Sequence, residues 1–102
     1  MERRNYNVVL HTLIGPRYGQ LALVFDGETL TGELAILAAH TAIQGTVDDD
    51  GSCRFRGELV TLLRVWPFTA KGQVTPQTFT ATLDMVSEEF LLEGTAVEKE
   101  GA

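Results

Sequence analysis

Turn-forming residues divide this sequence into short apolar segments, and that spacing constrains the fold more than any other feature. The turn groups are Gly15-Pro16, Asp26-Gly27, the run 48–52 and Thr75-Pro76-Gln77. Such groups supply a positive φ, a fixed φ or a side-chain acceptor for turn amides. Short segments bounded by turns at this spacing are typical of an all-β domain whose neighbouring strands run antiparallel.

Eight segments fit the spacing: 6–14, 19–26, 29–37, 41–48, 53–64, 66–75, 78–86 and 89–98. Within 19–26 and 78–86 large apolar residues alternate with small or polar ones, as a half-buried strand requires. The expected fold is an antiparallel up-and-down meander of about eight short strands in a single domain, residues 1–102. Residues 33–40 also fit a helix, so strand or helix stays open over 33–42.

Glycine recurs on one face of these segments. Gly32, Gly45, Gly57, Gly72 and Gly94 fall in phase with the large apolar residues of their strands. Glycine inside a strand marks a bend or the close approach of another backbone. Five glycines in phase indicate a sheet coiled on its concave side, which predicts closure into a small barrel. The alternative is a loosely packed sandwich in which the glycines are unrelated.

The run DGETLTG at 26–32, inside an eight-segment meander, resembles the hairpins of avidin-like and lipocalin-like barrels. Avidin-like proteins line their ligand cavity with several tryptophans, whereas this chain has only Trp66. The Gly-x-Trp that lipocalins carry near their start is absent. The resemblance therefore implies a lipocalin-like barrel topology and carries over no ligand.

Charge and composition exclude several classes of partner. The formal charge is −6, from 14 acidic and 8 basic residues, so the global field would repel a phosphate backbone. We therefore expect no nucleic acid partner, and no membrane partner because the apolar runs are too short to span a bilayer. A lone Cys53 and a start without a signal-peptide pattern indicate a reducing, cytoplasmic location.

No group of residues in the sequence carries recognisable catalytic or metal-binding chemistry. His11, His40 and Cys53 lack the close paired spacing of metal ligands. The acidic run 48–50 lacks the alternating ligands and terminal glutamate of a calcium loop. Neither serine lies in a motif for nucleophilic catalysis. We expect no catalytic residue, metal or cofactor, and an enzyme is only the third alternative.

The meander topology predicts two chemically different rims. Turns at 15–18, 38–40, 64–67 and 87–88 share one rim, which collects Arg17, Tyr18, His40, Arg64 and Trp66. The other rim is acidic. A basic, aromatic mouth favours a small anion with an apolar body. The sequence thus predicts that these five residues bind a small amphiphilic anionic ligand. The alternative is that they are solvated or cap the core, and that nothing binds.

Some strands carry apolar residues on the outward face as well: Ala35, Leu37, Val60 and Leu62. Strands that are apolar on both faces need cover on both. We expect a two-fold homodimer through these residues. The alternative function is therefore a structural or interaction protein that acts through this dimer or through a partner surface, without a ligand.

Overall fold

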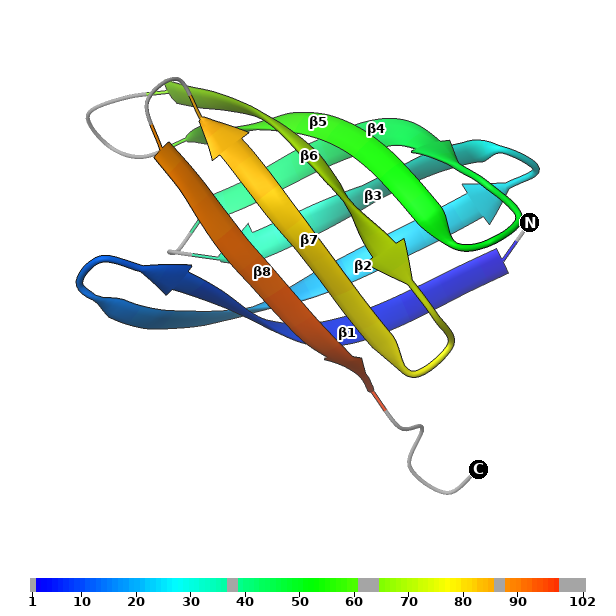
Figure 1. Ribbon diagram of the computed structural model, residues 1–102, viewed down its shortest axis with the longest axis horizontal. Helices are drawn as coiled ribbons and strands as arrows, with labels where there is room; N and C mark the ends of the chain where they lie inside the picture. Colours follow the sequence, from blue (N-terminus) through cyan, green and yellow to red (C-terminus); the bar gives the residue numbers. More distant parts are fainter. Residues whose placement is uncertain (1, 37–38, 61–64, 86–87, 98–102) are drawn as a thin grey trace.

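The computed structural model describes residues 2–36, 39–60, 65–85 and 88–97, and nearly all of them lie in eight strands (Figure 1). The strands are β1 (Glu2–Thr12), β2 (Gly15–Asp26), β3 (Thr29–Ile36), β4 (Ala39–Val47), β5 (Ser52–Val60), β6 (Val65–Val74), β7 (Thr78–Met85) and β8 (Glu88–Ala96). Each strand pairs antiparallel with the next, and β1 pairs with β8 to close the barrel. The all-β meander barrel predicted from the sequence is confirmed.

The stretch that also fitted a helix is strand wherever it is described. Residues 33–36 end β3 and residues 39–42 begin β4. Leu34 and Ile36 are buried, whereas Glu33 is exposed and Ala35 only partly buried. This period of two suits a pleated strand with one face on the core, and that burial decides against the helix.

Buried side chains from all eight strands form one core inside the barrel. Leu21 and Leu23 of β2 and Phe79 and Leu83 of β7 are buried, as the alternation predicts. Aromatic rings occupy the centre: Phe79 lies 5.9 Å, centroid to centroid, from both Tyr6 and Phe55. Contacts of this kind stabilise a core beyond the area that they bury.

The five in-phase glycines all face the interior, because each pairs directly with buried residues of the adjacent strands. A Cβ on Gly45 would lie 2.5 Å from the Cα of Phe55, and one on Gly72 would lie 2.6 Å from the Cα of Ala81. The neighbouring backbone therefore occupies the place of a side chain. This confirms the coiled sheet, and the sandwich alternative is wrong. Gly19 is a sixth inward glycine, which the sequence reasoning missed.

The strand ends gather at two ends of the barrel, as a meander requires. The last residues of β1, β3, β5 and β7 and the first residues of β2, β4, β6 and β8 lie at one end, here called the aromatic end, and the opposite strand ends lie at the acidic end (Figure 1). The first turn lies at residues 13–14 rather than at 15–18. Thr12 pairs with Gly15, and its hydroxyl donates to the Gly15 carbonyl at 2.6 Å, which places Pro16 inside β2.

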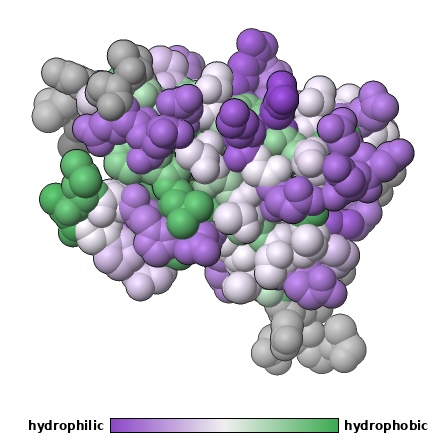
Figure 2. Space-filling model, in the orientation of Figure 1, coloured by the Kyte–Doolittle hydropathy of each residue, from purple (hydrophilic) through white to green (hydrophobic). Residues whose placement is uncertain are grey.

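The β1–β2 hairpin projects beyond the rest of the barrel at the aromatic end. Pairing of β2 with β3 starts only at Gln20, and pairing of β1 with β8 stops at His11. The tip residues Leu13 and Ile14 are 88% and 79% exposed. Figure 2 shows this tip as apolar surface at the left of the view.

Candidate functional site

Two of the five residues predicted to bind a ligand lie on the inner face at the aromatic end. Arg17 pairs directly with buried Leu10, and Trp66 pairs with buried Leu59. Directly paired residues of antiparallel strands point to the same side of the sheet, so both side chains project from the inner face. Arg17 is partly buried, and Trp66 is 39% exposed.

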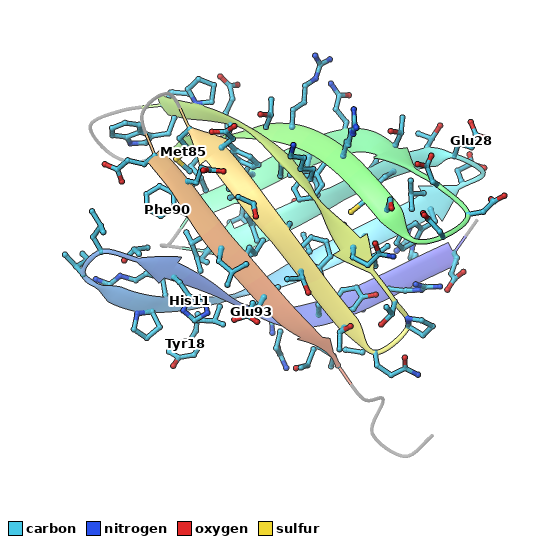
Figure 3. All side chains as sticks on the ribbon, in the orientation of Figure 1. His11, Tyr18, Glu28, Met85, Phe90 and Glu93 are labelled. Carbon is cyan, nitrogen blue, oxygen red and sulfur yellow. The ribbon has the colours of Figure 1, made fainter. Side chains whose placement is uncertain are left out.

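Apolar side chains also lie at this end of the barrel. Met85 and Phe90 are partly buried and pack against the core. Figure 3 shows both of them near the same end of the barrel, on the last part of β7 and the first part of β8. The aromatic end therefore combines a cationic group with a thioether and two aromatic rings.

Among the described residues, the guanidinium of Arg17 has one hydrogen-bond partner. Its Nη1 donates to the Pro16 carbonyl at 3.1 Å. No carboxylate of the described residues forms an ion pair with it. A guanidinium carries five N–H donors, so Arg17 retains donors for a ligand oxyanion.

Two other predicted residues lie on the outer face. Tyr18 pairs with Val9 and points away from the barrel (Figure 3). His40 pairs with Ala35, and its Nδ1 lies within hydrogen-bonding distance of Glu33 Oε1, at 2.8 Å, on the exposed face. Neighbouring residues of a strand face opposite sides, so Arg17 and Tyr18 cannot share one pocket. The fifth residue, Arg64, lies outside the described residues.

The acidic end holds an inward-facing contact that the sequence reasoning missed. Arg4 pairs with buried Leu23 and so lies on the inner face, with its guanidinium 5.0 Å from the ring centroid of Phe25. Its Nε donates to Glu2 Oε2 at 2.6 Å. Arg4 lies two residues before buried Tyr6 in β1, and this period-two spacing could have predicted its inward position. This cation–π contact covers the core at the acidic end.

The acidic turns themselves are exposed, as predicted, and one of them is ordered by a local hydrogen bond. Asp50 Oδ1 accepts from the Ser52 amide at 2.9 Å. That hydrogen bond lowers the pKa of Asp50, because it favours the ionised carboxylate. The bond belongs to the turn between β4 and β5, and it gives the carboxylate a structural role.

A second basic cluster lies on the outer face, and the sequence reasoning did not find it. Arg54, Arg56 and Lys71 line a groove of about 660 Å³ that crosses the outside of the barrel from β3 to β8. Arg54 is the direct register partner of Lys71, and Arg56 lies two residues further on the same face. The spacing of the two arginines at i and i+2 could have placed them on one face of a strand. Placing Lys71 beside them requires the β5–β6 register.

Other functional chemistry is sparse in the described part of the chain. It holds no group of three histidine, cysteine or acidic residues placed to bind a metal ion. His11 Nε2 and Glu93 Oε1 lie 2.9 Å apart in an exposed pair on β1 and β8 (Figure 3). No helix long and apolar enough to cross a membrane occurs in ranges 2–36, 39–60, 65–85 and 88–97.

No model of a known protein family matches the sequence, and no curated protein is detectably similar to it. Solved structures do match. A redesigned β-barrel, mFAP1, bound to DFHBI is 16% identical with a TM-score of 0.65, over 92% of this chain and 93% of that chain. A second redesigned β-barrel is 10% identical with a TM-score of 0.65, over 94% of this chain and 90% of that chain. What they share with this chain is the fold.

Proposed function

We propose that this barrel binds a small amphiphilic anion at its aromatic end. The observation that carries the proposal is the inward position of Arg17 at the end of an apolar core, where most of its N–H donors have no partner among the described residues. A charged group next to an apolar surface suits a ligand with an anionic head and an apolar body. The mFAP1 structure, a barrel of the same fold, was solved bound to DFHBI, which supports a ligand site in such a barrel.

The predicted residues have different roles in this proposal. Arg17 binds the anionic head, and Trp66 with Phe90 contacts the apolar body. Arg64 is proposed as a second cation at the same mouth. Tyr18 and His40, on the outer face, contact only a part of the ligand that extends over the rim.

The proposal is tested by titrating the protein with decanoate while the fluorescence of Trp66 is followed. Decanol, which has the same alkyl chain length and no charge, is the control ligand. We expect saturable binding of decanoate, and Arg17→Gln weakens it about tenfold because a hydrogen bond to a charged group is lost. Arg3→Gln is the control variant, since it removes the same charge from an exposed position. Fluorescence and melting temperature that stay constant with decanoate would refute the proposal, as would equal losses in both variants.

A second candidate is an interaction protein that acts as a cytoplasmic homodimer through Ala35, Leu37, Val60 and Leu62. Leu37, Leu62 and the side chain of Val60 lie outside the described residues, and Ala35 is partly buried. One observation favours this candidate. Val65 is the register partner of Val60, it alternates with inward-facing Trp66, and it is 53% exposed.

Light scattering on a size-exclusion column tests the dimer. We expect twice the mass of the chain at micromolar concentration, and Val65→Lys gives a monomer because it places a charge in the apolar contact. A monomeric wild-type protein at that concentration removes the case for this interface.

A further inference from the structure

The outer-face groove concentrates positive charge on an acidic protein. The chain has 8 lysines and arginines against 14 acidic residues. Three of those cations, Arg54, Arg56 and Lys71, line this one groove. None of them forms an ion pair with a carboxylate in the described part of the structure. The cluster is therefore a local reversal of the overall charge.

The position of Lys71 opposite Arg54 opposes folding stability. Directly paired residues of antiparallel strands hold their Cβ atoms about 4.5–5.5 Å apart, and like charges there are destabilising. Arg54 and Lys71 are such a pair, and Arg56 extends from the same face of β5. A bound anion would convert this repulsion into attraction between all three cations and the ligand.

The rest of the groove is polar. Five threonines supply hydroxyl groups around the cations: Thr29, Thr31, Thr46, Thr69 and Thr82. Asp84 and Glu89 lie at the β7–β8 side of the groove, as acceptors for ligand hydroxyls. Hydrophilic side chains cover much of the surface over β5 and β6 (Figure 2). This lining suits a polar ligand and differs from the apolar and aromatic residues at the aromatic end.

We propose that Arg54, Arg56 and Lys71 form a binding site for a tetrahedral oxyanion, the phosphate or sulfate group of a small polar molecule. Arg54 and Arg56 donate paired N–H groups to its oxygens, and the Lys71 ammonium contributes a point charge from β6. The site shares no residue with the aromatic end. Failure of one proposal therefore leaves the other intact.

The test uses inorganic phosphate, sulfate, glucose 6-phosphate and glucose at constant ionic strength. Guanidinium NMR signals of Arg54 and Arg56 report binding, and we expect saturable shifts with the three oxyanions and none with glucose. Tighter binding of glucose 6-phosphate than of phosphate identifies an ester as the ligand. Equal binding identifies the free anion.

Variants separate a built site from a general effect of charge. Lys71→Gln is expected to weaken phosphate binding at least about tenfold. It is also expected to raise the melting temperature in chloride, because the repulsion from Arg54 is removed. Arg3→Gln, an exposed arginine on β1, is the charge-matched control and leaves phosphate affinity unchanged. Absence of saturable shifts up to about 10 mM ligand, or equal weakening in both variants, would overturn the proposal.

Discussion

Gly57 illustrates how a missing side chain permits the barrel to coil. A Cβ at this position would lie 2.9 Å from the Ala42 carbonyl oxygen and 3.1 Å from atoms of Ile43 and Phe68. The space for a side chain is therefore already filled by two neighbouring strands. Any larger residue must displace β4 or the aromatic core.

Gly57→Leu is expected to lower the free energy of unfolding by about 1–3 kcal/mol or more, because it overpacks the core. Urea unfolding followed by far-UV circular dichroism measures the change. Glu58→Leu is the matched control: it adds a leucine one residue away on the exposed outer face, where the effect stays within about 0.5 kcal/mol. If Gly57→Leu unfolds at the same urea concentration as the wild type, Gly57 does not face a packed core.

Tyr6 is a fully buried residue with a polar hydroxyl group. Its hydroxyl donates to the Thr75 carbonyl at 2.6 Å and so ties β1 to the β6–β7 turn. Burial raises the pKa of Tyr6, because the interior disfavours the phenolate, and an interaction of the hydroxyl with the Arg4 guanidinium opposes part of that rise. The native state therefore keeps the Tyr6 proton at a pH where the unfolded chain has lost it.

This raised pKa makes the folding stability fall at high pH. The contribution of Tyr6 to the free energy of unfolding is fully present below its pKa in the unfolded chain, about 10. It is lost as the pH rises through the higher pKa of the folded state. Tyr6→Phe is expected to cost about 1 kcal/mol at pH 7. Its stability should also fall less steeply than that of the wild type above pH about 10. Parallel unfolding curves for the two proteins over that range would contradict the assignment.

The residues that sequence reasoning placed correctly are those whose direction depends only on period-two alternation. The inward glycines and buried Cys53 belong to this group. The candidate site was harder to predict, because two residues at the same end of the barrel can still lie on opposite faces of the sheet. Arg17 and Tyr18 are at the same end of the barrel, yet they project to opposite sides of β2.

Among the elements, the β1–β2 hairpin departs most from what its sequence suggests. Gly15-Pro16 looks like the turn, but Pro16 lies within β2 opposite His11. In a two-residue hairpin the pair next to the closing pair is not hydrogen-bonded across the ladder. The N–H that Pro16 lacks would have faced the side where β3 has already ended, so proline costs no ladder bond there.

The exposed tip of this hairpin is expected to be dispensable for folding. Leu13→Asn with Ile14→Gly gives a favourable two-residue turn and removes the apolar tip. The free energy of unfolding should change by no more than about 0.5 kcal/mol, because neither side chain reaches the core. Urea unfolding measures this, and retention on a hydrophobic column should decrease. A loss above about 1 kcal/mol would show that the tip packs against the barrel.

For the molecule as a whole, one core shared by eight strands predicts cooperative unfolding. Trp66 reports the aromatic end, and circular dichroism reports every strand. We expect the thermal transitions seen by the two signals to coincide within error. An earlier transition in Trp66 fluorescence would indicate that the aromatic end opens independently of the rest.

The closed topology was predictable from the phase of the glycines, but the surface chemistry was not. The cationic groove depends on the register that sets Arg54 opposite Lys71, and a one-residue shift would turn Lys71 toward the core. Turn spacing locates a strand to within a few residues and does not fix that register.

Pairing of β1 with β8 also constrains how the molecule is made on the ribosome. β1 is synthesised first, yet one of its two hydrogen-bonding partners is complete only after residue 96 has been added. Until then a nascent meander exposes two unpaired strand edges, which invite pairing with other chains. In the closed barrel these two edges pair with each other. The period of greatest aggregation risk therefore ends when β8 has left the exit tunnel and can pair with β1.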